Sequence, residues 1–280
     1  MGRAFDRIFV IMLENELEST VRQDPFMLDL EAKGVRLSDC HGVTHPSQPN
    51  YIAAIAGIPI LVDDNCKDID RQNLVDLLEA KGVSWKAYME DLPEDNKAVC
   101  ISADRLYFRK HNPFVSFNNV RNNPARLAKI VNARRLADDL AANAVPEFCW
   151  YTPNIQNDGH SPPNTSNGDF AGSVAFLSKF LQDFLPPLLK NAGFMKGTLI
   201  MITFDESIPH ADNHVYATLL GEMVRPDTTE TGHYSHYSLL RTVEENFGLG
   251  TLGNNDLTAN WFQFLWGQKP AAFDWSLHKQ

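Results

Sequence analysis

Short apolar runs rich in β-branched and aromatic residues alternate along the chain with segments of helical spacing. Three of these runs, residues 7–13, 147–152 and 198–204, have the composition of strands that are buried on both faces. Strands that alternate with helices are typical of proteins with a parallel sheet. The pattern therefore predicts an α/β fold with a mostly parallel central sheet flanked by helices.

The spacing of apolar residues and the presence of helix-terminating residues also predict where the helices lie. We expect helices over residues 74–81, 174–185 and 236–247, and a strand over residues 83–89. Gly82 and Gly248 are placed to end the first and last of these helices. Pro186-Pro187 is expected to break the second helix, because proline lacks the N–H that an α-helix needs.

The chain has 280 residues, of which 44% are hydrophobic and 21% charged, and this is the range of ordinary globular proteins. The composition shows no boundary between two separate hydrophobic cores, so we expect one domain over residues 1–280. The first apolar run, residues 8–13, is too short for a secretion signal or a membrane span. The sequence as written therefore predicts no signal peptide and no transmembrane segment. It reads as cytoplasmic on that basis, but the localisation and the oligomeric state are left open.

The formal net charge of -10, without a stripe of Lys and Arg, argues against nucleic acid as a partner. The same charge repels a small phosphate ester, so an enzyme acting on one needs a local cation. The four cysteines form no CxxC pair, which makes a zinc knuckle a poor interpretation. Two disulfides and four buried thiols both fit the cysteine pattern.

Polar residues follow each of the three predicted strands. Glu14-Asn15 come after the first, Asp158 and His160 lie in the loop after the second, and Asp205-Glu206 come after the third. Ligands of open parallel sheets bind beyond the carboxyl ends of the strands. Carboxylate and amide oxygens suit a divalent cation, with Zn²⁺, Mg²⁺, Mn²⁺ and Ca²⁺ all compatible. Helix capping or exposure at a rim is the alternative for each pair.

Ser47 is predicted to be the N-cap of a helix, because the segment Thr44–Tyr51 leads into an apolar run that ends at Gly57. A helix N-terminus favours negative charge by about 0.3–1 kcal/mol, which helps an alkoxide or an incoming phosphate but cannot ionise a serine. A coordinated cation can do so. The alternative is that Ser47 is simply a cap.

The remaining candidates are histidines and one basic segment. Asp158 and His160 share a glycine-containing loop that suits metal binding, phosphate contact or proton transfer, or is simply a turn. The segment Arg109–Phe114 offers donors for phosphate oxygens, or forms a solvated loop. His233 and His236 bracket a helix start. No role is assigned to the other histidines: His41, His45, His210, His214 and His278.

The sequence resembles the phosphoesterases that include fungal and bacterial acid phosphatases and phospholipases C, within the alkaline phosphatase superfamily. Six blocks carry the resemblance in order: Leu13-Glu14-Asn15, Thr44–Tyr51, Arg109–Pro113, Thr152–Asn154 with Asn157–His160, Thr203–Glu206 and His236–Glu244. The resemblance implies that Ser47 is the nucleophile and is phosphorylated during turnover. It implies a metal held by Glu14, Asn15, Ser47, Asp205 and Glu206. It further implies catalytic roles for His160, His236 and Asp158, and phosphate contacts from Asn15, Asn50 and His111.

These inferences predict metal-dependent hydrolysis of a small-molecule phosphate monoester through a phosphoserine intermediate. Three alternatives remain open at the level of sequence. The first is a phospholipase C-type phosphodiesterase, which can use the same nucleophile and metal. The second is a hydrolase dedicated to one phosphorylated metabolite, and the third is a protein that binds phosphate without catalysis.

Overall fold

The computed structural model describes residues 2–160, 170–208 and 212–268. Its eight strands form one sheet in the order β4-β3-β5-β1-β6-β7-β2-β8. The strands are β1 (Arg7–Leu13), β2 (Val35–His41), β3 (Trp85–Met89), β4 (Ile130–Asn132), β5 (Phe148–Thr152), β6 (Thr198–Phe204), β7 (Ala217–Leu220) and β8 (Thr228–Ser235). All neighbouring strands run parallel except β7, which is antiparallel to β6 and β2. The predicted α/β fold with a mostly parallel sheet is confirmed.

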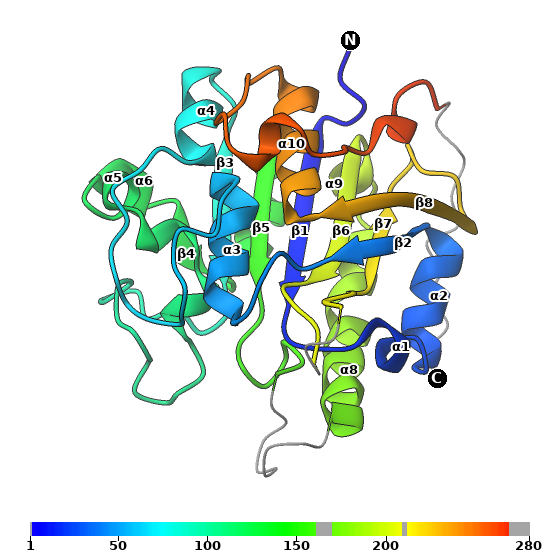
Figure 1. Cartoon of the computed structure of the whole chain (residues 1–280), viewed down its shortest axis with the longest axis horizontal. Coiled ribbons are helices and arrows are strands. Elements are labelled where there is room, and N and C mark those ends of the chain that lie inside the picture. Colours follow the sequence, from blue (N-terminus) through cyan, green and yellow to red (C-terminus); the bar gives the residue numbers. More distant parts are fainter. Residues whose placement is uncertain (1, 161–169, 209–211, 269–280) are drawn as a thin grey trace.

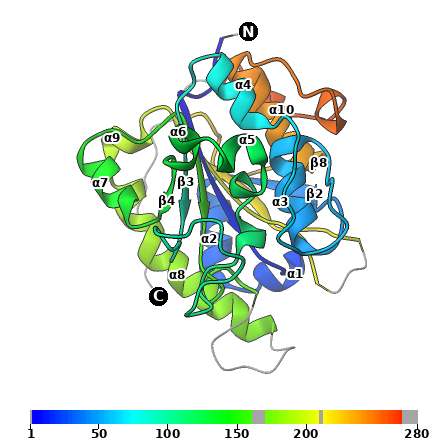
Figure 2. The same cartoon turned by 90° about the vertical axis from the view of Figure 1, so that its left-hand side faces the viewer.

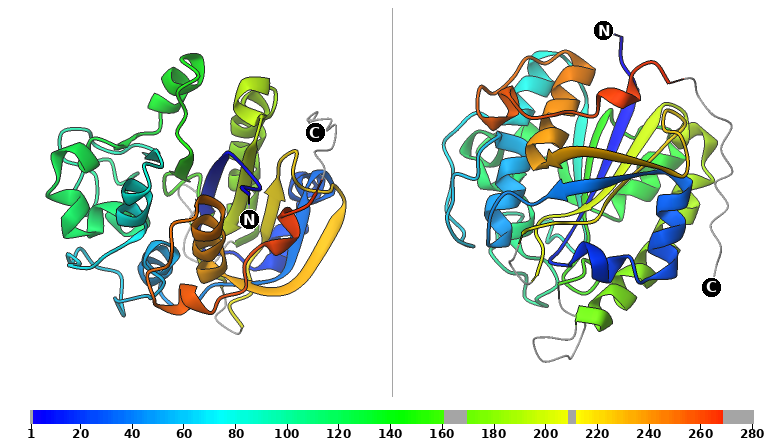
Figure 3. Two further views of the ribbon diagram at one scale, coloured as in Figure 1. Left: turned by 90° about the horizontal axis from the view of Figure 1, so that it is seen from above. Right: turned by 45° about the vertical axis from the view of Figure 1, so that its right-hand side comes forward.

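Helices cover both faces of the sheet (Figure 1). The α-helices are α1 (Glu18–Val21), α2 (Pro25–Lys33), α3 (Ser47–Ala56), α4 (Leu74–Ala80), α5 (Asn118–Arg121), α6 (Pro124–Leu127), α7 (Arg135–Ala141), α8 (Phe170–Leu189), α9 (Ala192–Met195) and α10 (His236–Phe247). The described residues also contain four 3₁₀ turns: η1 (Arg109–His111), η2 (Phe114–Ser116), η3 (Asn255–Leu257) and η4 (Gln263–Leu265). Seen from above, α3 and α10 lie on one face and α8 on the other (Figure 3).

The central strand β1 explains why the middle of the sheet is apolar. It pairs with β5 on one side and β6 on the other, and its residues Ile8–Leu13 are fully buried. A strand covered on both faces has no polar face, so its sequence is a continuous apolar run.

The edge formed by β3 and β4 is flanked by the short helices α5 and α6 (Figure 2). No helix within the described residues is long and apolar enough to cross a membrane.

Helix α8 differs from the prediction, because it continues through Pro186-Pro187 to Leu189. Its buried face continues as well, since Leu185, Leu188 and Leu189 are all covered by the core. The prolines lie in the last turn, where their missing N–H groups cost two intrahelical bonds but little helix remains beyond them to be disrupted. Burial of three leucines therefore outweighs the cost of the missing N–H groups, and the expectation that the helix breaks there is wrong.

Candidate active site

Three neighbouring strands, β5, β1 and β6, end at the same edge of the sheet. Glu14 directly follows β1, Asp205 directly follows β6, and Asp158 lies in the loop after β5. Two backbone hydrogen bonds join these segments: Glu14 N–H donates to the Asp158 carbonyl (2.8 Å), and Asp205 N–H donates to the Leu13 carbonyl (2.9 Å). The loops that carry the predicted acidic residues are thus fixed to one another by the backbone.

Ser47 is the first residue of α3, and Pro46 rather than Ser47 occupies the N-cap position. The predicted capping role is therefore wrong. The hydroxyl is turned toward carboxylates instead of the helix N–H groups: Ser47 Oγ lies 3.0 Å from Glu14 Oε2 and 3.0 Å from Glu206 Oε1. Ser47 is 1% exposed. The structure thus brings a buried hydroxyl from α3 to the ends of β1 and β6.

The carboxylates around Ser47 are buried with like charges close together. Glu14 and Asp205 are fully buried, and Glu206 is nearly so. Burial, together with the charges of Glu14 and Glu206, raises the pKa of Asp205 well above its usual range. Burial also opposes the ionisation of Glu14, but the neighbouring His111 and His160 outweigh it and lower its pKa. Such a cluster is stable only if positive charge or protons compensate it.

The donor set around Ser47 fits a divalent cation. Asp205 Oδ1 accepts a hydrogen bond from Asn15 N–H (3.1 Å), whereas the buried Asp205 Oδ2 has no hydrogen-bond partner among the described residues. Asn15 Oδ1 lies 3.5 Å from Ser47 Oγ. Buried oxygens without partners are costly, and carboxylate and amide oxygens are the ligands that hard and borderline cations prefer. The set consists of Glu14, Asn15, Ser47, Asp205 and Glu206.

Two histidines reach this cluster from different loops. His111 Nε2 lies 3.1 Å from Glu14 Oε1, and its Nδ1 lies 3.5 Å from Asp158 Oδ2. Burial lowers the pKa of His111 to about 3, so its imidazole is neutral. His160 Nδ1 lies 3.2 Å from Glu14 Oε2. Burial opposes protonation of His160, but Glu14 outweighs it and raises the pKa. Asp158 Oδ1 accepts the His160 backbone N–H (2.9 Å), which fixes that loop.

Two predicted site residues are engaged with the backbone. His236 is 1% exposed, and its Nε2 donates to the Asp205 carbonyl at 2.5 Å. Burial lowers the pKa of His236 to about 4. Asn50 is fully buried and bonds the backbone of residues 43–46, which lead into Ser47. Both side chains position the segments that carry the site, and their contacts with a phosphate stay predictions.

The sequence interpretation missed His45, whose Nδ1 pairs with Glu206 Oε2. Its position two residues before Ser47, within the Thr44–Tyr51 block, was the available signal. The interpretation also missed that Asp39, His41 and His233 lie together. His210 and His278, which received no role, lie outside the described residues.

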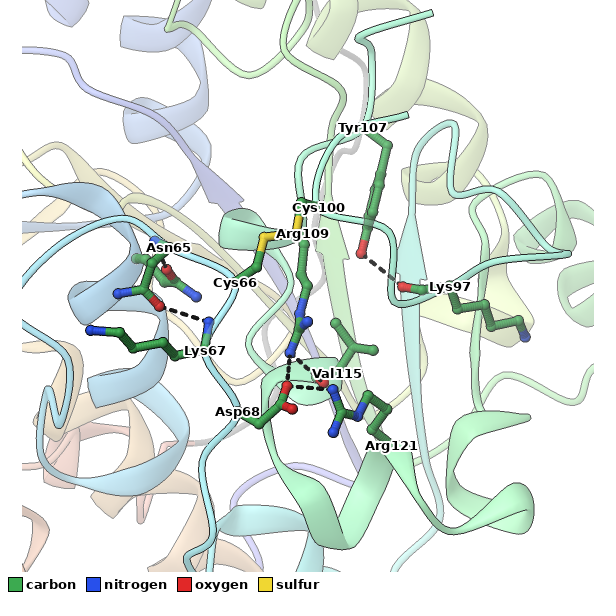
Figure 4. The surroundings of a disulfide bond; sticks show 11 residues. Asn65, Cys66, Lys67, Asp68, Lys97, Cys100, Tyr107, Arg109, Val115 and Arg121 are labelled. Carbon is green, nitrogen blue, oxygen red and sulfur yellow. Dashed lines mark hydrogen bonds and ion pairs between the residues drawn. A yellow bond between two sulfur atoms is a disulfide. The ribbon is translucent and has the colours of Figure 1, made fainter. Parts of the chain in front are cut away.

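Residues of the basic segment Arg109–Phe114 have two different sets of contacts. Arg109 is buried and donates to Asp68 at 2.6 Å, so it is not part of a solvated loop, and a contact with phosphate stays a prediction (Figure 4). Among its neighbours in the segment, His111 reaches the carboxylates around Ser47. A disulfide joins Cys66 to Cys100 beside Arg109, while Cys40 and Cys149 are free and buried. Both of the cysteine arrangements that we considered, two disulfides and four thiols, are therefore wrong.

The site thus consists of a buried serine among carboxylates and imidazoles, and it lies at the carboxyl ends of the parallel strands of an α/β protein. The fold is that of the alkaline phosphatase superfamily. A solved member of that superfamily from Vibrio parahaemolyticus is similar with a TM-score of 0.62 at 14% identity, over 97% of this chain and 72% of that one. The chain belongs to the Phosphoesterase family, whose model matches residues 19–250.

Two fungal relatives are similar over most of the chain. It is 37% identical over 272 residues to a probable acid phosphatase of Kluyveromyces lactis, covering 92% of this chain and 62% of that protein. It is 35% identical over 275 residues to an acid phosphatase of Aspergillus fumigatus, covering 92% of this chain and 58% of that protein. The chain thus spans about three-fifths of the length of these relatives.

Proposed function

We propose that this chain hydrolyses phosphate monoesters, with Ser47 Oγ as the nucleophile. The observation that carries the proposal is the position of Ser47 Oγ, 3.0 Å from each of two buried carboxylates, Glu14 and Glu206. Those carboxylates, with Asn15 and Asp205, would hold a divalent cation beside the hydroxyl. When bound, the cation supplies the positive charge that favours the serine alkoxide and the phosphoryl oxygens.

The reaction proceeds in two displacements. Ser47 Oγ attacks phosphorus and forms a phosphoserine, while the bond to the substrate alcohol breaks and the alcohol leaves with a proton. Water then attacks the phosphoserine on the opposite face and releases inorganic phosphate and the serine hydroxyl. The His160 side chain is 31% exposed, so it can contact the phosphoryl oxygens or the leaving alcohol, and Asp158 holds the loop that carries it.

Family membership and the two relatives named as acid phosphatases support this proposal. The α3 N-terminus adds a favourable field for the negative charge that develops at Ser47. The buried carboxylates alone would repel a phosphate, so the proposal requires compensating charge at the site. This requirement is the reason that the proposed function includes a metal ion.

The test is Ser47→Ala, assayed with p-nitrophenyl phosphate in the presence of divalent cations. We expect kcat to fall by at least about a thousandfold, because the nucleophile is lost. No acid-stable phosphoenzyme should be trapped, and the melting temperature should stay near that of the parent. Ser116→Ala is the control, since Ser116 is an equally buried serine outside the site. Near-parental turnover by the Ser47 variant would remove Ser47 as nucleophile.

The same assay separates monoester from diester hydrolysis. We expect p-nitrophenyl phosphate to be turned over faster than its bis-ester. Faster turnover of the bis-ester, or of a phosphocholine lipid, would show a phospholipase C-type diesterase that uses the same serine. Absence of turnover for every ester, with phosphate still bound, would show a binding protein instead.

A further inference from the structure

A cluster of histidines and a carboxylate lies on the edge of the sheet where β2 pairs with β8. The parallel register places Asp39 opposite His233, and His41 follows Asp39 by two residues on β2. A register shift between Leu37 and Asp39 creates this pairing, because three steps along β8 match two along β2. Bulges of this kind redirect side chains. Here the bulge brings His233 to the carboxylate of Asp39.

The three side chains converge at the spacing of metal ligands. His41 Nε2 lies 2.7 Å from Asp39 Oδ1, and His233 Nδ1 lies 3.1 Å from Asp39 Oδ2. One ligand atom from each residue lies within 4.8 Å of the other two. A tetrahedral Zn²⁺ with bonds of about 2.0–2.1 Å separates its ligand atoms by about 3.3 Å. Side-chain shifts of an ångström or so thus bring all three into coordination.

A hydrogen bond at Nδ1, the ring nitrogen that does not face Asp39, fixes the orientation of His41. Its Nδ1 lies 2.9 Å from the carbonyl oxygen of Asp212, which can only accept a hydrogen bond. Nδ1 therefore carries a hydrogen and Nε2 is directed at Asp39. Metal-binding histidines are commonly held in this way by a carbonyl or carboxylate on the second nitrogen. On β8, Asn260 donates to the His233 carbonyl at 3.0 Å and supports that residue.

We propose that Asp39, His41 and His233 form a second metal site, selective for a borderline transition ion such as Zn²⁺. Two imidazoles and one carboxylate suit zinc, copper, nickel or ferrous iron better than magnesium or calcium. The side chains of His41 and His233 are 21% and 68% exposed, so water can complete the coordination. Both also line a groove of about 400 Å³, through which water can reach the two imidazoles.

The proposed site is separate from the one at Ser47, but it lies on the two strands that lead to that region. Strand β2 ends at His41, six residues before Ser47, and β8 ends directly before His236. An ion shared by Asp39 and His233 joins the ends of these two strands. The bound ion therefore stabilises the edge of the sheet from which the Ser47 and His236 segments depart.

The test measures metal binding rather than catalysis. Protein stripped with chelator is titrated with Zn²⁺ by calorimetry, and with Co²⁺ by its visible absorption, which reports imidazole coordination. The background is Glu14→Gln/Asp205→Asn, which removes two ligands of the Ser47 site. We expect this background to bind one Zn²⁺ per chain. Adding His41→Ala and His233→Ala is expected to weaken that binding at least about a hundredfold and to abolish the Co²⁺ bands.

His214→Ala is the matched control. The His214 ring stacks on His41 with centroids 5.1 Å apart, but its Nε2 is directed at the Ser38 carbonyl, away from the cluster. Its variant should bind Zn²⁺ like the background. Equal Zn²⁺ binding with and without His41 and His233 would overturn the proposal, as would equal loss in the His214 variant. Because the Ser47 site is disabled throughout, this result does not depend on the proposed hydrolysis.

Discussion

The amide of Asn50 makes four hydrogen bonds to the backbone of residues 43–46. Its oxygen accepts from Val43 and Thr44, and its nitrogen donates to the carbonyls of Thr44 and Pro46. The Asn50 side chain is fully buried, so its donors and acceptor are costly to leave without partners. The side chain thus fixes the turn from which Ser47 reaches the carboxylates.

We expect Asn50→Asp to destabilise the fold by about 1–3 kcal/mol, because an oxygen replaces the two donors and faces two carbonyls. Urea unfolding measures the stability, and p-nitrophenyl phosphate kinetics measure the consequence at Ser47. A positioning role predicts a lower kcat together with the lower stability. A direct phosphate contact, as the family resemblance implies, predicts a higher KM with stability unchanged. Asn122→Asp, on the exposed surface, is the control.

At the scale of single residues, the sequence predicted which side chains lie together at the sheet edge but not the hydrogen-bond or ion-pair partner of each one. Glu14 and Asp205 follow apolar strands, and the ends of parallel strands share one sheet edge, so their convergence follows from topology. The partners of Arg109 and His236 could not be predicted. Arg109 pairs with Asp68, and His236 donates to a backbone carbonyl, and these contacts depend on loop packing that no local pattern encodes.

At the scale of elements, α10 carries a buried acid outside the candidate site. Glu244 is 1% exposed, and neither of its carboxylate oxygens has a hydrogen-bond partner among the described residues. Burial and the neighbouring Asp256 raise the pKa of Glu244 from 4.5 to about 8. The folded protein therefore holds a proton that the unfolded chain releases above about pH 4.5. This contribution to stability is full at lower pH and is lost as the pH rises toward 8.

Glu244→Gln is expected to flatten the loss of stability between pH 5 and 8. Glutamine cannot ionise, so up to about 1.4 kcal/mol per pH unit of linkage disappears. Melting temperatures measured across this range in the parent and the variant provide the check. Glu245→Gln, the next residue on the same helix, should leave the pH profile as in the parent. Parallel profiles for Glu244→Gln and the parent would show that Glu244 ionises normally.

The disulfide Cys66–Cys100 joins two loops that are 34 residues apart in the chain (Figure 4). The first loop also contains Asp64, which accepts the backbone N–H of Gln48 at 2.8 Å and pairs with Lys110 at 2.8 Å. Gln48 directly follows the nucleophile candidate. The disulfide therefore restrains a loop that is bonded to the start of α3.

We expect Cys66→Ser/Cys100→Ser to lower the free energy of unfolding by about 2–4 kcal/mol, because the unfolded chain regains loop entropy. Turnover should fall as well, since Asp64 is less firmly held against α3. Urea unfolding and p-nitrophenyl phosphate kinetics measure the two effects. Dithiothreitol should reproduce both in the parent protein and change nothing in the double variant. A parent protein indifferent to dithiothreitol at full reduction would contradict this expectation.

Helices α3, α4 and α10 and strands β1, β3, β5 and β6 were predictable because their patterns are local, whereas the end of α8 shows the limit of that approach. Its apolar face continues past Pro186-Pro187 and packs on the core, so tertiary burial decides the helix end. The edge strands were not predicted either. Strand β8 reads Thr-Thr-Glu-Thr-Gly-His-Tyr-Ser, which is polar, and it is a strand because β2 offers it a pairing edge. Such pairing depends on the whole sheet.

At the scale of the whole molecule, the net charge of -10 and the buried carboxylates at Ser47 act in the same direction. Both disfavour the folded state when no cation compensates them. A cation that binds only the folded protein stabilises it by about 2.7 kcal/mol at a free concentration of one hundred times its Kd. We therefore expect a metal bound at the proposed site to contribute to the stability of this fold as well as to the proposed chemistry.

Removal of divalent cations with a chelator is expected to lower the melting temperature and to abolish phosphate-ester hydrolysis, with both restored by added cation. In Glu14→Gln/Asp205→Asn two of the three buried carboxylates around Ser47 are gone, so its metal-free form should melt above the metal-free parent. Its response to added cation should shrink to the part that Asp39, His41 and His233 contribute. A variant that melts below the metal-free parent would show that these acids are compensated within the protein itself, by His160, and that the fold does not require a cation at Ser47.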